Sequence, residues 1–153
     1  MNIFVLDLNP RKCAIYHANC HVTKMILESA QLLSGVHWVE GGTAPYKLSH
    51  KNHPCAIWAR ECIENYLWLC DLGIELSKEY SYRYGKRHKS QDIIEWCLLN
   101  IPKIRSNGVM TQFALAMPDE CKIGTAVESY REYYKTEKRS LGVWKNRDIP
   151  KWF

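Results

Sequence analysis

Polar side chains recur in residues 20–33 at the spacing of one face of a helix. His21, Lys24, Glu28 and Gln31 follow one another at steps of three, four and three residues. At about 100° per residue these four side chains fall within one narrow sector, and apolar side chains cover the neighbouring arc. The pattern predicts an amphipathic helix that places an imidazole, an amine, a carboxylate and an amide together.

Two interpretations of this polar face stay open. Any amphipathic helix has a solvated side, and Lys24 with Glu28 can be an ordinary surface ion pair, although lysine leading glutamate is the weaker orientation. The same grouping can instead place a nucleophile beside its base in a pocket.

The remaining pattern predicts a mainly α protein. We expect an extended or strand segment at residues 2–8, a helix from about Tyr16 or Asn19 to Leu33 capped by Gly35, a long helix from Pro54 to Gly85 that bends at Gly73, a helix from Ser90 to Pro102, and a helix from Thr125 to about Arg139 that begins with a capping box. The aromatic C-terminal tail should pack back on the body. The prediction is a compact single-domain helical bundle over residues 1–153, built around two long helices with a short N-terminal extended segment.

Composition fits one reduced, soluble domain. The chain has 153 residues and seven cysteines, which are odd in number and form no CxxC pair. Such cysteines are typical of buried thiols in a cytosolic protein, and no secretory signal or membrane span is expected. We therefore expect a cytoplasmic location and no membrane partner.

The chain carries a formal net charge of +5, concentrated in two basic clusters. One lies at residues 83–89 and the other at residues 135–151. Clusters of this kind can meet a phosphate backbone, so DNA is the expected partner.

The long second helix carries two polar residues in an apolar stripe, Asn65 and Arg83. A buried unpaired amide or guanidinium is costly, so each must find a partner. One account gives Asn65 a loop carbonyl and lets Arg83 reach solvent near the helix end. The other has both side chains meet the His21 to Gln31 face across a cleft.

Residues 49–55 precede this helix and include Asn52 and His53. These two residues stand where free N–H groups could seat a phosphate, or they simply cap the helix. His50, His53 and Cys55 could also ligate zinc, but no second ligand pair is present, so we predict no metal and no cofactor.

Residues 80–89 interleave three tyrosines with cations. Lys86, His88 and Lys89 follow Arg83 here, and aromatic rings can stack on bases while cations neutralise phosphates. Basic residues also gather at helix ends because of the helix dipole. We assign these residues, with Gln31, Asn52, His53 and Asn65, to substrate binding.

The predicted chemistry centres on Lys24, Glu28 and His21. A lysine becomes nucleophilic when desolvation or a nearby cation lowers its pKa, and Glu28 one turn away could exchange the proton. Attack of an amine on a deoxyribose C1′ gives a Schiff base. Alternatively, Glu28 stabilises an oxocarbenium-like state and His21 acts as general acid or base.

The chain resembles the pyrimidine-dimer DNA glycosylases of the phage endonuclease V type. The resemblance rests on the polar-faced first helix, on Asn52-His53-Pro54 before a long helix, on the Tyr-Arg-Tyr-Gly-Lys end of that helix and on the aromatic tail near Trp152. It is also similar to a set of phage proteins that share HVxKMILESAQLL, HKNHPC, YRYGKxHK, FAxAMP and a WKNR-P-WF ending.

The resemblance implies a small helical DNA-repair enzyme whose nucleophile is the α-amine of an N-terminal threonine, assisted by a glutamate at the position of Glu28. Residue 2 is Asn2 here, so that amine does not carry over. Lys24 supplies the amine, or Met1 does, or the chemistry is lost or replaced. The expected function is a DNA glycosylase, with or without abasic-site lyase activity. The alternative is a non-catalytic protein that binds nucleotides or nucleic acid.

Overall fold

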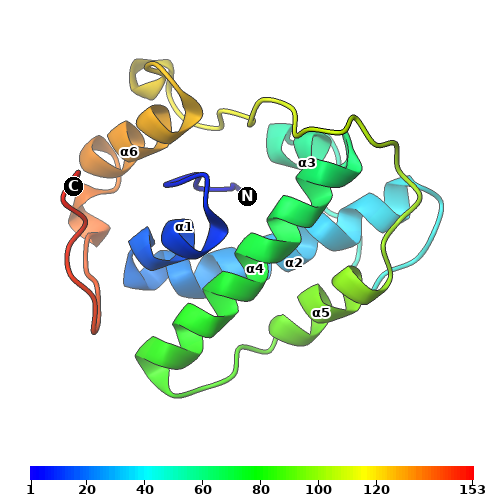
Figure 1. The fold of residues 1–153 in the computed structure, drawn as a ribbon, viewed down its shortest axis with the longest axis horizontal. Helices are drawn as coiled ribbons and strands as arrows, with labels where there is room; N and C mark the ends of the chain where they lie inside the picture. Colours follow the sequence, from blue (N-terminus) through cyan, green and yellow to red (C-terminus); the bar gives the residue numbers. More distant parts are fainter.

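A computed structural model describes all residues, 1–153, and contains only helices and loops (Figure 1). The elements are α1 (Pro10–Tyr16), α2 (Asn19–Val39), α3 (Pro54–Ala59), α4 (Ile63–Tyr84), α5 (Gln91–Leu99), the 3-10 helix η1 (Asp119–Cys121), α6 (Ala126–Thr136) and the 3-10 helix η2 (Arg139–Leu141). The predicted all-α domain around two long helices is confirmed. No helix has the length and apolar character needed to cross a bilayer.

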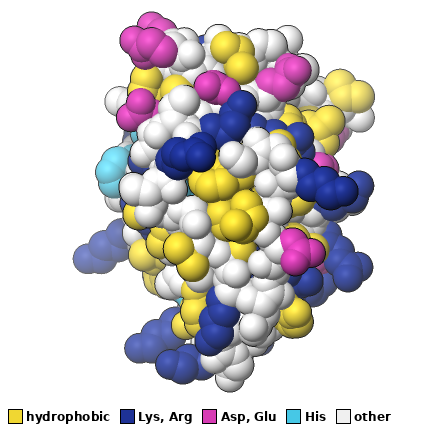
Figure 2. All heavy atoms as spheres, turned by 90° about the vertical axis from the view of Figure 1, so that its left-hand side faces the viewer, with side chains coloured by type: hydrophobic (Ala, Val, Ile, Leu, Met, Phe, Trp, Pro, Cys, Tyr) yellow, Lys and Arg dark blue, Asp and Glu magenta, His cyan; other side chains and the backbone are white.

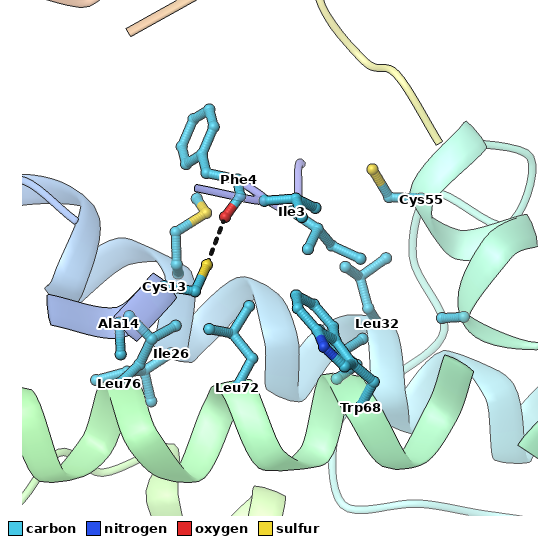
Figure 3. Close-up of a cluster of buried hydrophobic side chains, with 14 of the residues drawn as sticks. Ile3, Phe4, Cys13, Ala14, Ile26, Leu32, Cys55, Trp68, Leu72 and Leu76 are labelled. Carbon is cyan, nitrogen blue, oxygen red and sulfur yellow. Dashed lines mark hydrogen bonds between the residues drawn. The ribbon is translucent and has the colours of Figure 1, made fainter. Parts of the chain in front are cut away.

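The two long helices, α2 and α4, form the centre of the packing. They contact each other most extensively, with α1 and α5 packed against α4. Trp68, Leu72 and Leu76 on α4 point toward the N-terminal segment and α1, and Leu32 on α2 closes the same cluster (Figure 3). Burial of such side chains contributes about 2 kcal/mol each and supplies most of the helical stability.

The N-terminal segment is extended and buried but pairs with no strand. Residues 3–6 are at most 4% exposed and lie on the core between α2, α4 and α6 (Figure 1). Cys13 ties the segment to α1, because its Sγ donates to the Phe4 carbonyl at 3.2 Å and accepts from the Leu6 N–H at 3.3 Å (Figure 3). The segment has no partner for a strand ladder, so side chains from other elements bond its backbone: the Asn2 N–H donates to Glu28, and the Leu6 carbonyl accepts from Arg131.

Several predicted helix boundaries are wrong. Gly35 does not end α2, which continues to Val39 because Val36 extends the buried stripe. The helix α1 was missed, although Asn9 caps it by accepting from the Lys12 N–H and Pro10 occupies its first turn.

The expected bend at Gly73 lies instead at residues 60–62, between α3 and α4. Gly73 lies inside α4, directly against Ile94 of α5. Two hydrogen bonds stabilise this break. Ile63 donates its N–H to the Arg105 carbonyl at 2.9 Å, and the Asn65 side chain donates to the Trp58 carbonyl at 2.8 Å. The local sequence gave no sign of the contact with Arg105, which is more than forty residues away in the chain.

The C-terminal half follows the prediction more closely. Thr125 and Glu128 form the capping box of α6, and Gly85 ends α4 with a left-handed φ of 62°. The tail folds back, with the Trp144 indole donating to the Tyr16 carbonyl at 3.0 Å. Six of the seven cysteines are buried and only Cys20 is exposed, and none forms a disulfide.

Candidate functional site

The four polar residues of α2 divide into buried and exposed members. Glu28 is 6% exposed and His21 is 5% exposed, whereas the Lys24 side chain is 64% exposed. Gln31 is half-buried and its side chain forms no hydrogen bond within the protein. Because Glu28 is buried and Lys24 is exposed, the Glu28 carboxylate needs further hydrogen-bond or ion-pair partners.

The N-terminus of the chain supplies those partners. The α-amino nitrogen of Met1 lies 3.8 Å from Oε1 of Glu28, and the Asn2 backbone N–H donates to Oε2 at 2.8 Å. Lys24 places Nζ 3.6 Å from the same Oε1. Two amines therefore lie close to the same carboxylate oxygen. We call Met1, Lys24 and Glu28 the amine–carboxylate site.

The Asn2 side chain anchors this arrangement from below. Its amide donates to the Ala116 carbonyl at 2.8 Å, and its Oδ1 accepts from the Tyr130 hydroxyl at 3.0 Å. The Ile3 N–H donates to the same Oδ1 at 2.8 Å, and the Cys55 thiol is a third, weaker donor at 3.7 Å. In the sequence, Asn2 stood out only as a departure from threonine, and Tyr130, which is 128 residues away, carries no local signal of this contact.

His53 is the one predicted binding residue that lies beside the amine–carboxylate site. Burial lowers its pKa, the N-terminal amine and His50 lower it further, and Glu28 opposes them. The ring caps α3, because Nδ1 accepts from the Cys55 N–H at 3.1 Å. The accepting Nδ1 leaves the proton of the neutral ring on Nε2.

The other interpretations of residues 49–55 do not hold. α3 has only six residues, and His53 itself occupies the position expected for a phosphate, so capping is the role observed. Asn52 is exposed in the turn before it. No three His, Cys, Asp or Glu side chains converge as metal ligands, and burial raises the pKa of Cys55 to about 11.

His21 faces the core and does not join the two amines. Its Nδ1 pairs with the Tyr134 hydroxyl at 2.6 Å, and its ring packs 4.6 Å from that of Phe4. Burial lowers its pKa to about 4, helped by Lys138 and Lys24. A ring that is neutral and enclosed at pH 7 is a packing element, so the predicted proton-transfer role of His21 loses its geometric basis.

Asn65 and Arg83 do not meet the polar face of α2, so the predicted cleft between the two long helices is wrong. Asn65 donates to the Trp58 carbonyl of α3 and pairs with Thr111 in the loop between α5 and η1. Arg83 is 2% exposed and does not reach solvent. Its guanidinium bonds Glu79, Asn19 and the carbonyls of Ile15 and His17, which are structural partners.

The remaining predicted binding residues lie at the end of α4. Lys86 and Lys89 are exposed and form no ion pair. His88 is half-buried, its Nδ1 accepts from the Ser90 N–H at 3.1 Å, and burial lowers its pKa, opposed by the Thr23 carbonyl. These three belong to a different surface from the amine–carboxylate site.

Cations and aromatic rings gather on the face formed by α6 and the C-terminal segment. Figure 2 shows Lys and Arg side chains around a hydrophobic patch on this face. Lys138 lies over Tyr133 at 5.0 Å, and Arg131 lies over Trp152 at 5.1 Å. Four cations of the predicted 135–151 cluster lie over aromatic rings in this way: Lys138, Arg139, Lys145 and Arg147.

Glu28 does not line the apolar cavity between the N-terminal segment and α6. This cavity has a volume of about 760 Å³ and is lined by Asp7, Leu8, Phe113, Leu115 and the first turn of α6. It contains no amine, so its lining offers no nucleophile of the predicted kind.

No protein-family model, no curated protein and no solved structure matches this chain.

Proposed function

We propose that the protein is a DNA glycosylase with abasic-site lyase activity that uses the amine–carboxylate site. The observation that carries this proposal is the approach of the Met1 α-amine to Oε1 of Glu28 at 3.8 Å, with the Asn2 N–H on the other oxygen. A buried carboxylate that holds a primary amine is the minimal equipment for attack on a sugar carbon followed by proton transfer.

The Met1 amine is the preferred nucleophile. A lysine amine is activated by desolvation or by a neighbouring cation, and the Lys24 side chain is 64% exposed. The Met1 α-amine instead lies against the buried Glu28 carboxylate. In this proposal Lys24 stays positively charged, pairs with Glu28 and contacts a phosphate of the DNA.

The proposed reaction begins with attack of the neutral amine on deoxyribose C1′. The bond from C1′ to the base breaks, and the base leaves with the bonding electron pair and acquires a proton. Glu28 stabilises the positive charge that develops on the sugar and accepts the proton that the amine loses. Glu28 then returns this proton to O4′ as the C1′–O4′ bond breaks, and the nitrogen lone pair forms the protonated Schiff base, which permits loss of the C2′ proton and elimination of the 3′ phosphate.

DNA binding in this proposal uses the positive charge along α2. Lys24 lies beside Glu28, and the charges of Lys138 and Lys24 both lower the pKa of the buried His21, two turns earlier on the same helix. Affinity should fall steeply with salt, because counterions are released from each neutralised phosphate.

The test is borohydride trapping on duplex DNA that contains one abasic site. The wild-type protein is expected to form a covalent adduct, and peptide mapping is expected to place it on the Met1 amine. Glu28→Gln should abolish trapping, and Lys24→Ala should leave the adduct in place with weaker DNA binding. Lys78→Ala is the matched control, since Lys78 is an exposed lysine paired with a glutamate on α4.

Two results would overturn parts of the proposal. An adduct mapped to Lys24 and lost in Lys24→Ala would transfer the nucleophile to that side chain. A wild-type protein that binds the duplex and never cross-links would remove the Schiff-base chemistry altogether. Acetylation of the N-terminus, checked by intact mass, should block trapping while leaving the folded protein stable.

A further inference from the structure

A second polar pocket lies at the end of α4 and takes no part in the proposed reaction. It has a volume of about 450 Å³ and is lined by Thr23, Tyr80, Tyr84, Lys86 and Lys145. The lining comes from three separate segments: α2, the end of α4 and the C-terminal segment. Figure 1 shows the C-terminal segment running down toward the end of α4.

The charge of this pocket is unbalanced. Lys86 and Lys145 both line it, no carboxylate does, and neither lysine forms an ion pair anywhere in the protein. The neighbouring Arg87, by contrast, is neutralised by Asp92 and Glu95. Two uncompensated amines on one concave surface attract an anion.

The walls of the pocket are aromatic rings that contact one another. The Tyr80 and Tyr84 rings lie 5.1 Å apart and are tilted by 49°. His88 packs edge-on against Tyr80 at 5.0 Å, and Lys145 lies over the Tyr84 ring at 5.4 Å. Such rings offer a face for stacking, and a nucleobase has a matching π-face.

The loop that carries Lys145 is fixed before any ligand arrives. The Lys145 N–H donates to Oδ1 of Asn19 at 2.8 Å, and that same oxygen accepts from the buried Arg83 at 3.0 Å. The next residue, Asn146, turns the chain with a left-handed φ of 57°, and its carbonyl accepts from the Tyr82 hydroxyl at 3.2 Å. A preformed loop reduces the entropy lost on binding.

We propose that this pocket binds a nucleotide, with the base against Tyr80 and Tyr84 and the phosphate between Lys86 and Lys145. Its volume suits a ligand of this size. The nucleotide is either free or part of an unpaired DNA strand, since both present the same base and phosphate. The inference does not rest on the amine–carboxylate chemistry, because none of the pocket residues contacts Glu28.

The experiment is titration calorimetry with two probes that carry the same base, thymidine 5′-monophosphate and a pentathymidylate without terminal phosphates. Amide chemical shifts of Thr23, Tyr84 and Lys145 should locate the binding. Replacement of both Lys86 and Lys145 by alanine is expected to weaken binding about tenfold or more. Tyr84→Leu removes the ring and should weaken binding about fivefold or more, whereas Tyr84→Phe, which keeps the ring, should weaken binding less.

The matched control replaces Lys12, an exposed lysine on α1 outside this pocket, and should leave affinity unchanged. Tighter binding of the mononucleotide identifies a free ligand, and tighter binding of the pentathymidylate identifies a DNA strand. Failure of both probes to bind, or binding that the double lysine variant leaves intact, would overturn the proposal. Borohydride trapping is scored separately, so loss of the pocket and loss of the proposed lyase are distinguishable.

Discussion

Arg83 donates a 2.7 Å hydrogen bond from Nε to Oε1 of Glu79, one turn earlier on α4. Arg147 of the C-terminal segment donates to both oxygens of the same carboxylate at 2.9 Å. Arg83 also bonds the carbonyls that end α1, so this one cluster joins α1, α4 and the C-terminal segment. It also holds Asn19, on which the Lys145 loop rests.

Glu79→Gln should therefore destabilise the protein strongly. It leaves Arg83 buried without its counter-ion, which costs about 3 kcal/mol and lowers the melting temperature by roughly 10 °C. Chemical denaturation of the wild type and of Glu79→Gln measures the difference in the free energy of unfolding. Glu75→Gln on the same helix removes only the exposed pair with Lys78 and should cost under about 0.5 kcal/mol. Equal losses in the two variants would contradict a role for the buried cluster.

The buried histidines should make the protein sensitive to mild acid. Burial lowers the pKa of His17 to about 3 and that of His21 to about 4. Below about pH 6.5 the unfolded chain binds protons on these rings and the folded protein does not, so the free energy of unfolding falls as pH falls. Each ring contributes a slope of up to about 1.4 kcal/mol per pH unit.

His21→Phe tests this origin of the pH dependence. The new ring still packs beside Phe4 and does not titrate, so urea denaturation between about pH 7 and pH 4.5 should give a shallower fall in stability. A slope identical to that of the wild type would mean that His21 is protonated in the folded protein. Glu79 acts in the same direction at lower pH: burial raises its pKa, but hydrogen bonds from Arg147 and Arg83 outweigh this and hold it below its ordinary value.

Two glycines inside helices should respond oppositely to alanine. A Cβ at Gly73 would lie 2.7 Å from Cδ1 of the buried Ile94, whereas one at Gly35 would lie 3.5 Å from Leu48, an ordinary contact. Gly73→Ala should cost about 1–3 kcal/mol through overpacking between α4 and α5. Gly35→Ala should be neutral or stabilise by up to about 1 kcal/mol through helix propensity.

A double-mutant cycle checks the Gly73 prediction. Ile94→Val removes the Cδ1 that clashes, so the cost of Gly73→Ala should be smaller in the Ile94→Val background. Additive losses from the two substitutions would show that the clash is relieved by backbone movement.

The sequence predicted those features that depend on neighbours in the chain. Helical periodicity located α2, α4 and α5, the capping box located the start of α6, and Gly85 marked the end of α4. Each of these signals acts within one or two turns of a helix. The break between α3 and α4 was missed because it is stabilised by Arg105, more than forty residues away.

The candidate site was predicted only in part for the same reason. The spacing of Lys24 and Glu28 fixed their proximity, and the structure places them 3.6 Å apart. Periodicity could not predict the hydrogen-bond partners of the polar side chains of α4. Asn65 bonds the Trp58 carbonyl of α3, and Arg83 bonds the His17 carbonyl at the end of α1. The contact of Glu28 with the N-terminus depends on how the first six residues cross the core, which no spacing encodes.

Tyr130 should control the geometry of the proposed nucleophile without touching it. Its hydroxyl bonds Asn2 at 3.0 Å and the Ala114 carbonyl at 2.8 Å, and Asn2 in turn fixes the position of Met1 against Glu28. Tyr130→Phe removes this anchor at a cost of about 1–2 kcal/mol. Because small displacements of a reacting group lower the rate strongly, borohydride trapping should slow by about ten- to a hundredfold while DNA affinity stays the same.

Tyr133→Phe provides the matched control for this prediction. Tyr133 lies on the same helix, is half-buried and forms no hydrogen bond through its hydroxyl, so its trapping rate should equal that of the wild type. A slow Tyr130→Phe with normal DNA binding separates positioning of the amine from general loss of structure, since unfolding would reduce both. Equal trapping rates in the two tyrosine variants would mean that the N-terminus reaches Glu28 without the Asn2 anchor.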